Sequence, residues 1–420
     1  MLGVLKNRDK NKHYSLQLEI GLALILIGMP LGTAIRNVLP NLELVNFIMF
    51  LSFLLVIDYK NLINLKLPFL SFWFIILIIF QIIEILYATI EKVNDFYFYH
   101  IYLILILIGL STQSRTKTFY SFLRIIFYFS GFISFVVFYQ ATLGLTQLIG
   151  GGYVGTGRLW LVEGGDPINM ARALLVNIIV VMVYKGNSPF EKIMRYVFLV
   201  TSIIGLLGFG TRSSIVVSII VFTLFLWNKQ ILKITTTKDF FRIVSYVFLI
   251  TLVLIFLYLK NDFFSQKVDY IIEAVERGVA TYFLGNSNLG VDGSTIVRYR
   301  TFNKALEIMR NDFEFHNFVF GNGYMGFYID IPLIQVFFDL GIFGFIYFIF
   351  TIVFPFKSNV FKTRFNDVYL FIKLFCVQIL FDQFFTGLPY YYTQFVPIII
   401  LLFVSKRRLL NQKKTEFNLK

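Results

Sequence analysis

Long apolar runs separated by short polar segments constrain the fold of this chain more than any other feature of its sequence. Repeated runs of about 15–23 residues are almost free of charge, and about 20 apolar residues of helix cross the hydrocarbon core of a bilayer. Of the 420 residues, 57% are hydrophobic and only 15% are charged, whereas ordinary globular domains are about 25% charged. Because lipid cannot satisfy exposed backbone polar groups, the sequence predicts an all-α, polytopic membrane protein.

The runs predict about twelve transmembrane helices. They lie at 16–34, 42–57, 67–87, 96–110, 119–140, 170–184, 194–210, 213–227, 240–259, 331–354, 368–386 and 389–404. The first run follows a basic segment as a signal peptide would, but its length and the spans after it favour an uncleaved helix. Spans one to nine therefore occupy 1–259, with an outer loop at 141–169. A large loop occupies 260–330, and the last spans and a basic tail occupy 331–420.

Lysine and arginine residues set the orientation of these spans. If the N-terminus lies in the cytoplasm, the segments predicted to face inward collect most of the basic residues, while the short outer segments keep isolated ones. This alternation follows the positive-inside rule. It predicts that both termini are cytoplasmic and that the large helical loop at 260–330 is extracytoplasmic. The net charge of +14 has the same explanation, so no nucleic-acid partner is expected.

Arginines on the predicted outer side form the first group of candidate site residues, because topology disfavours cations there. They are Arg36, Arg158, Arg172, Arg212, Arg298 and Arg300. Several lie near membrane ends beside glycine-rich turns, which indicates an anionic ligand. Arg212 lies in the turn 208–214, where Ser213 or Ser214 can cap the following helix. A guanidinium beside a helix N-terminus suits phosphate; the alternative is an arginine that snorkels to the interface.

Arg298 and Arg300 lie in a helix that we expect from near Ser294 to about Asn311. Seven residues make nearly two helical turns, so Arg298 shares a face with Ala305, whereas Arg300 is rotated by roughly 200° from Arg298. Arg298 is therefore expected to point toward the protein, where it needs an anionic partner, and Arg300 toward water. Arg298 is the better site candidate of the two.

Carboxylates and a histidine form the second group of candidates, and each has a structural alternative. Asp330, at the exit of the loop, can act as a general base or position a hydroxyl, or it can cap the next helix. Asp382 lies in an apolar run, where an ionisable group faces a cavity or pairs with a partner such as an outer arginine. Asp166 can bind a ligand or pair with Arg172. His316 lies between aromatic residues, which is more typical of a structural histidine.

Metal and nucleotide sites are not expected. The single cysteine, Cys376, lies in an apolar run, and the histidines His13, His100 and His316 are far apart in sequence. The chain has no glycine fingerprint for a nucleotide, and the predicted inner loops do not exceed about 15 residues. We therefore expect no cofactor.

Three segments resemble the Wzy-type superfamily of O-antigen and capsule polymerases, whose fold is shared with O-antigen ligases. They are residues 298–306 (Arg-Tyr-Arg-Thr-Phe-Asn-Lys-Ala-Leu), 320–324 (Phe-Gly-Asn-Gly-Tyr) and 338–344 (Phe-Asp-Leu-Gly-Ile-Phe-Gly). The family pattern places an arginine four residues before an aromatic, then Gly-x-Gly, then acidic-x-Gly-x-x-Gly. The Gly-Thr-Arg-Ser-Ser turn and the segment 166–171 also resemble family motifs, so the resemblance covers roughly 150–350.

The resemblance implies a metal-independent glycosyltransferase on the outer face of a bacterial cytoplasmic membrane. Its substrates would be oligosaccharide repeat units on undecaprenyl diphosphate, and the growing glycan would pass to a hydroxyl of the next lipid-linked unit. Arg298 and Arg212 would stabilise the charge that develops on the diphosphate, helped by Arg158 or Arg172. Asp330 would accept the hydroxyl proton. Further partners would be the flippase and the chain-length regulator of the same pathway.

Alternative functions remain open at this point. Ligases of the family carry a His-Asn pair where this chain has Asp330 and Ile331, which favours a polymerase over a ligase. A flippase for lipid-linked oligosaccharides or another transporter would also have about twelve spans, although no internal repeat is evident. A sensor or scaffold is the third class. Aromatic residues such as Tyr324 can stack on sugars or belong to the interfacial belt.

Overall fold

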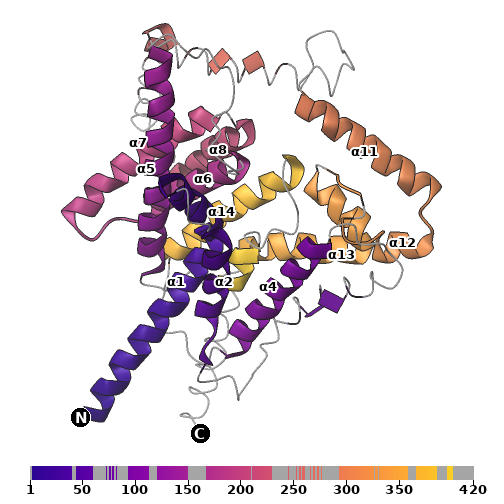
Figure 1. Ribbon diagram of the computed structural model, residues 1–420, viewed down its shortest axis with the longest axis horizontal. Helices are drawn as coiled ribbons and strands as arrows, with labels where there is room; N and C mark the ends of the chain where they lie inside the picture. The colour runs from indigo at the N-terminus through magenta and orange to yellow at the C-terminus, as the bar shows by residue number, and fades with distance from the viewer. Residues whose placement is uncertain are drawn as a thin grey trace.

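The computed structural model describes most of the helical part of the chain. The described residues are 2–39, 44–59, 93–112, 121–149, 167–209, 211–228, 293–325, 327–329, 331–357, 366–385 and 395–400, with isolated positions between 72 and 82 and between 245 and 276. Within these ranges the regular secondary structure is helical and contains no strand (Figure 1). The all-α prediction is therefore confirmed for the described part.

Most of the helices overlap predicted spans, although the ends of several differ from the prediction by five residues or more. The helices are α1 (Leu2–Val38), α2 (Val45–Val56), α4 (Val93–Thr112), α5 (Phe122–Ile149), α6 (Pro167–Val183), α7 (Pro189–Phe209), α8 (Arg212–Asn228), α11 (Gly293–Asn311), α12 (Phe315–Phe320), α13 (Pro332–Lys357) and α14 (Asn366–Phe385). Helix α5 continues into the predicted outer loop at 141–169. The predicted spans 67–87, 240–259 and 389–404 lie largely outside the described residues.

Membrane-spanning helices are present in the described part of the chain. Three helices there are long and apolar enough to cross a bilayer: Leu16–Val38, Phe122–Gln140 and Pro189–Phe209. A fourth span results if Pro332–Ile346 and Phe348–Pro355, which meet at an angle of 62°, are counted together. The chain is thus a helical membrane protein, while the number of about twelve spans stays a prediction.

Small residues allow the first two helices to pack closely. Helix α1 packs against α2 and α5, and Gly21 and Gly32 face α2. A Cβ atom at Gly32 would lie 2.8 Å from the Cα of Val45, and one at Gly21 would lie 2.9 Å from the carbonyl oxygen of Ser52. Close approach of backbones through glycine is a common way for membrane helices to associate.

Buried polar side chains join α5, α6 and α7 inside the apolar core. Asn177 of α6 accepts a hydrogen bond from Ser130 of α5 at 2.8 Å and donates to Ser202 of α7 at 2.8 Å. Its amide also donates to the carbonyl oxygen of Phe198 at 3.3 Å. All of these polar groups are buried, so each bond removes an unsatisfied group from an apolar setting.

The directions of α5, α6 and α7 define two ends of this part of the molecule. Arg124 near the start of α5 and Tyr184 just after α6 both bond Glu191 near the start of α7. The opposite end holds the start of α6 and the end of α7, which is followed after two residues by α8. The end of α14 lies there too, because Arg172 pairs with Asp382.

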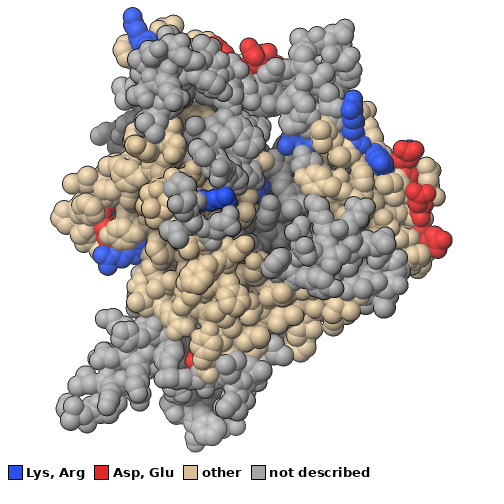
Figure 2. All heavy atoms as spheres, viewed as in Figure 1, with Lys and Arg blue, Asp and Glu red and all other residues tan. Residues whose placement is uncertain are grey.

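Helices α11, α12 and α13 lie across the molecule from α7 (Figure 1). Helix α12 packs on α13, and α13 packs on α14. Exposed charged side chains gather over α11 and α12 on the right of Figure 2. They are Arg300, Lys304, Glu307, Arg310, Asp312 and Glu314. This side of the molecule therefore combines a polar outer surface with the apolar helix α13 beneath it.

Candidate functional site

The exposure of side chains along α11 follows the helical faces expected from the sequence. Ala305 is fully buried and packs with Ile329 and Phe338. Arg298, which lies nearly two turns before Ala305, is half-buried, whereas Arg300 is exposed. The predicted difference in burial between the two arginines is therefore observed. The assignment of Arg298 to a ligand stays a prediction.

A glycine turn after α12 packs directly on the middle of α13. The backbone N–H of Asn322 donates to the carbonyl oxygen of Phe338 at 2.8 Å, and that of Gly323 donates to the carbonyl oxygen of Asp339 at 3.2 Å. A Cβ atom at Gly321 would overlap the carbonyl group of Asp339. The two segments that resemble the polymerase family, 320–324 and 338–344, thus lie against each other.

The backbone at this contact is one that only glycine adopts readily. Gly321 has φ 91° and ψ −174°, and Gly341 has φ 63° and ψ −167° inside α13. Such angles cost a residue with a Cβ atom about 1–3 kcal/mol. A Cβ atom at Gly341 would also overlap the carbonyl group of Val319. Gly341 therefore breaks α13 where α12 and the glycine turn approach it.

Gln335, in the first turn of α13, connects this contact to the end of the loop. Its side-chain oxygen accepts a hydrogen bond from the backbone N–H of Ile329 at 2.5 Å. Its side-chain nitrogen donates to the carbonyl oxygen of Phe327 at 2.9 Å and to Oδ1 of Asp339 at 2.8 Å. Gln335 and Asp339 are both fully buried. The amide therefore holds the segment that leads to Asp330.

Asp330 itself lies outside the described residues. On its C-terminal side, the carbonyl oxygen of Ile331 accepts hydrogen bonds from the backbone N–H groups of Ile334 at 3.0 Å and Gln335 at 2.9 Å. These are the first helical bonds of α13, so Ile331 occupies the N-cap position. The predicted role of Asp330 toward a substrate is not tested by this geometry.

An ion pair joins α6 to α14 at the opposite end from Glu191. Nε of Arg172 lies 2.9 Å from Oδ2 of Asp382, and the two side chains are 15% and 12% exposed. Nη1 of Arg172 also donates to Asn169 at 3.3 Å. The structure thus shows Asp382 paired with an arginine, one of the two alternatives expected for it. Asp166, the other partner considered for Arg172, lies outside the described residues.

Helix α8 begins at least two residues earlier than a cap at Ser213 or Ser214 would require. Arg212 is its first residue, and the backbone N–H of Ile215 donates to the carbonyl oxygen of Thr211 at 3.1 Å. The residue before the helix is therefore Thr211, and Ser213 and Ser214 lie in the first turn, so the expectation that one of them caps the helix is wrong. Arg212 is nevertheless at a helix N-terminus, as expected. Its side chain is not among the parts of the chain that the structure describes.

His316 and Tyr324 have contrasting environments. His316 is 49% exposed at the start of α12, and its Nδ1 lies 3.4 Å from Oε2 of Glu314. Tyr324 is only 5% exposed and belongs to the main apolar core. Its burial favours packing over contact with a sugar at the surface. Arg158 lies outside the described residues. Among those described, no group of three His, Cys, Asp or Glu side chains is placed to hold a metal ion.

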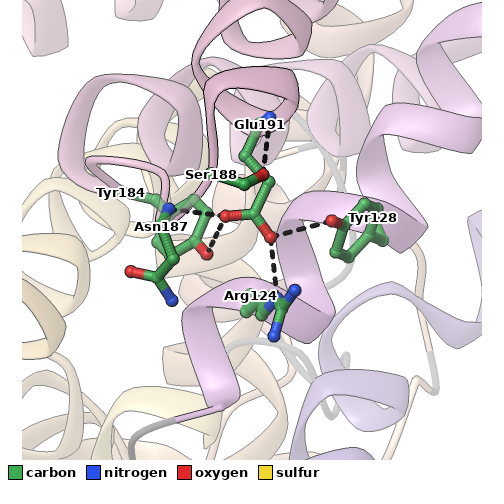
Figure 3. Close-up of polar contacts among 6 residues, drawn as sticks. All are labelled: Arg124, Tyr128, Tyr184, Asn187, Ser188 and Glu191. Carbon is green, nitrogen blue, oxygen red and sulfur yellow. Dashed lines mark hydrogen bonds and ion pairs between the residues drawn. The ribbon is translucent and has the colours of Figure 1, made fainter.

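A buried carboxylate that the sequence reasoning missed lies at the other end of the bundle (Figure 3). Oε1 of Glu191 accepts hydrogen bonds from Arg124 and Tyr128, both at 2.8 Å. Oε2 accepts from the hydroxyl of Tyr184 at 2.9 Å and from the backbone N–H of Asn187 at 2.6 Å. Four donors thus satisfy one fully buried carboxylate. The signal available in the sequence was an acid two residues after Pro189, which begins the helix.

Two groups of residues therefore remain as candidate ligand sites. One is the α11–α13 region, with Arg298, the glycine contact and the Gln335 brace. The other lies at the end of the bundle where α6 and α8 begin and α14 ends, and it holds Arg172 and Asp382. The chain matches no protein-family model and no curated protein.

Proposed function

We propose that this membrane protein is a polysaccharide polymerase. It would transfer a growing glycan from undecaprenyl diphosphate to the next lipid-linked repeat unit on the outer face of a bacterial cytoplasmic membrane. The observation that carries the proposal is the contact between Gly321 and Asp339. Two sequence segments that resemble the Wzy-type family separately, 320–324 and 338–344, meet in space through glycines that no other residue can replace without strain.

The orientation belongs to the same proposal. About twelve spans would cross the membrane with both termini in the cytoplasm, and the loop 260–330 would lie outside. The support is the end of the bundle marked by Glu191, where Arg124, Lys185, Lys192 and Arg195 also lie. Arg195 donates to the carbonyl oxygens of Val181 at 3.0 Å and Lys185 at 3.2 Å, which caps α6. Clustered basic residues favour this end as cytoplasmic.

The chemical step would need charge stabilisation and a proton acceptor. The acceptor hydroxyl oxygen forms a bond to the anomeric carbon of the donor sugar. The bond from that carbon to the diphosphate oxygen breaks, and its electron pair leaves with undecaprenyl diphosphate. We assign Arg298 and Arg212 to the departing diphosphate, because Arg298 is half-buried on α11 and Arg212 lies at the N-terminus of α8. The hydroxyl proton passes to Asp330.

Reconstitution provides the direct test. The purified protein is placed in liposomes with lipid-linked repeat units, a chelator and no nucleotide, and the glycans are separated by size. Polymerase activity gives products of two or more repeat units and free lipid diphosphate. Movement of the lipid-linked unit between leaflets without elongation would overturn the proposal in favour of a flippase. Transfer to a different acceptor without elongation would overturn it in favour of a ligase.

A further inference from the structure

One face of α7 is exposed along most of the helix, and its side chains are apolar. They follow one another at spacings of three and four residues, which places them on one side of the helix. Because α7 is long and apolar enough to cross a bilayer, this face is open to lipid chains. Its exposed residues are Phe190, Ile193, Tyr196, Val200 and Ile203.

Basic side chains lie at the N-terminal end of this apolar face. Lys192 is exposed and precedes Tyr196 by one turn, so the two lie on the same side of α7. Arg195 donates from Nε to the carbonyl oxygen of Val181 at 3.0 Å and from Nη1 to that of Lys185 at 3.2 Å. These bonds hold the exposed Lys185 beside the first two turns of α7.

The carboxylate of Glu191 fixes the turn that carries Lys185 (Figure 3). It is fully buried, and it accepts from the hydroxyl of Tyr184 at 2.9 Å and from the backbone N–H of Asn187 at 2.6 Å. Its other oxygen accepts from Nε of Arg124 at 2.8 Å. The turn is thus joined to α5 before any ligand binds, which lowers the entropic cost of binding.

Positive charge is in excess at this end of the bundle. Arg124, Lys185, Lys192 and Arg195 lie there, and Glu191 is the one acidic residue in the stretches 121–149 and 167–209. Because Glu191 is buried against Arg124, no acidic side chain of these stretches offsets the exposed lysines. Cations at the edge of an apolar face complement a phosphate group that is joined to acyl chains.

We propose that Lys185, Lys192 and the apolar face of α7 form a binding site for an anionic phospholipid of the surrounding membrane. The two lysines contact the phosphate group, and an acyl chain lies along Ile193 and Tyr196. In the orientation proposed above, this lipid belongs to the inner leaflet. The site goes beyond the polymerase function and does not depend on it, because it includes neither of the two candidate ligand sites described above.

The test is lipid binding to the full-length protein in detergent, measured by native mass spectrometry. Phosphatidylglycerol should bind more tightly than phosphatidylcholine. The double variant Lys185→Gln, Lys192→Gln should lower the affinity for phosphatidylglycerol by about fivefold for each lysine removed, with no change for phosphatidylcholine. Both lysines are exposed, so the lipid-free variant should unfold at the same temperature as the wild type. Equal affinities of the variant and the wild type for phosphatidylglycerol would overturn the proposal.

A matched control removes the same charge from another exposed surface. Lys304→Gln with Arg310→Gln takes two cations from α11. This variant should bind phosphatidylglycerol as tightly as the wild type does. A loss equal to that of the Lys185 and Lys192 variant would show that only the net charge of the protein matters, and would overturn the site.

Two further arms test whether the ligand is a lipid. Ile193→Ser with Tyr196→Ser should weaken the binding of both phospholipids, because the contact with acyl chains is reduced; unchanged affinity for both would contradict the proposal. Inorganic phosphate at millimolar concentration should not displace phosphatidylglycerol, since it lacks the acyl chains. Displacement by inorganic phosphate would overturn the lipid site in favour of a site for free phosphate.

Discussion

Arg298 and Arg300 are two residues apart, yet they face different surroundings on α11. Arg298 is half-buried and lies on the same face of the helix as Ala305, which packs against Phe338. Arg300 is exposed. We expect Arg298→Ala to lower the rate of glycan elongation by at least about 100-fold, because an oriented guanidinium that stabilises developing charge is removed. The rate is measured in liposomes by the size of the glycan products.

Arg300→Ala is the matched control for this prediction, since it removes the same charge from the same helix. It should change the elongation rate by less than about threefold, as expected for an exposed cation. Equal losses in the two variants would mean that the helix contributes only its overall charge, and Arg298 would lose its assignment.

Asp382 is paired with Arg172 in a largely buried setting, so removing only one partner leaves an uncompensated charge. We expect Asp382→Asn to reduce the stability of the folded protein by about 3–5 kcal/mol. The double variant Arg172→Gln, Asp382→Asn should recover part of this loss, because both charges are gone. Thermal unfolding in detergent gives the comparison. Additive losses in the double variant would contradict the pairing.

The sequence allowed the two arginines on α11 to be told apart but gave no signal for Gln335. The difference between Arg298 and Arg300 follows from helical periodicity, which depends only on spacing. The contacts of Gln335 reach back to Phe327 and Ile329, in a segment without periodicity. A polar residue one turn before Asp339 in an apolar run was visible in the sequence, but its partners were not. Glu191 was missed for the same reason.

The break in α13 depends on a contact between elements. Gly341 adopts angles that only glycine tolerates, and a Cβ atom there would overlap the carbonyl group of Val319. We expect Gly341→Ala to lower the free energy of unfolding by at least the backbone strain of about 1–3 kcal/mol. The overlap with Val319 should also disrupt the packing of α12 on α13. Thermal unfolding in detergent reports the change in stability.

Gly28→Ala is the control for the glycine prediction. Gly28 lies within α1, and an added Cβ atom would lie 3.1 Å from the Cγ2 methyl group of Ile48, which would have to move by only a few tenths of an ångström. Its unfolding temperature should therefore stay close to that of the wild type. A similar loss in both variants would show that the backbone angles of Gly341 are not the cause.

Glu191 connects α5, the residues after α6 and the start of α7, so its removal should lower the stability of the helix bundle. Glu191→Ala leaves the hydroxyls of Tyr128 and Tyr184 and the N–H of Asn187 without their acceptor. Of these three residues only Tyr184 is buried, and an unsatisfied buried hydroxyl costs about 1–3 kcal/mol, so we expect a fall in the unfolding temperature. Arg124→Ala should be milder, because the Arg124 side chain is 50% exposed. Similar unfolding temperatures for both variants would contradict the central role of the carboxylate.

The end of α11 at Asn311 was predicted from the sequence, whereas α7 begins at Pro189, five residues before the predicted start at 194. The break at Gly341 was not predictable, because it lies within a continuous apolar run and is caused by α12 and the turn at Gly321. Helix α5 also runs further than expected, to Ile149. Local composition therefore located the elements, while tertiary contacts decided where one of them bends.

The orientation of the whole molecule can be tested by labelling. Cys376 is the single cysteine and is buried, so few changes are needed to introduce reporter sites. His316→Cys and Lys192→Cys replace two exposed residues at opposite sides of the proposed membrane. A membrane-impermeant maleimide added to intact cells should label the variant at 316 and not the variant at 192. The reverse pattern would show the opposite topology. The parent protein, which carries only Cys376, is the control and should remain unlabelled.

At the scale of the molecule, the class of protein could be read from the sequence because lipid permits so few structures. The order of the helices followed from the same apolar runs. The meeting of 320–324 with 338–344 could not be derived, since nothing in either segment encodes its distance from the other. The pairing of Arg172 with Asp382, which are 210 residues apart, likewise depends on how α6 and α14 pack.

The first half of α13 has a consequence for how such a protein can diversify. Two separate stretches of the loop are fastened to it, at Gly321–Gly323 through backbone bonds and at 327–331 through Gln335. Helix α11 is joined to the same part of α13 through Ala305, which packs against Phe338. The exposed face of α11, with Lys304 and Glu307, is not part of that packing. We therefore expect new specificities to arise by substitution on this exposed face, without rebuilding the membrane core.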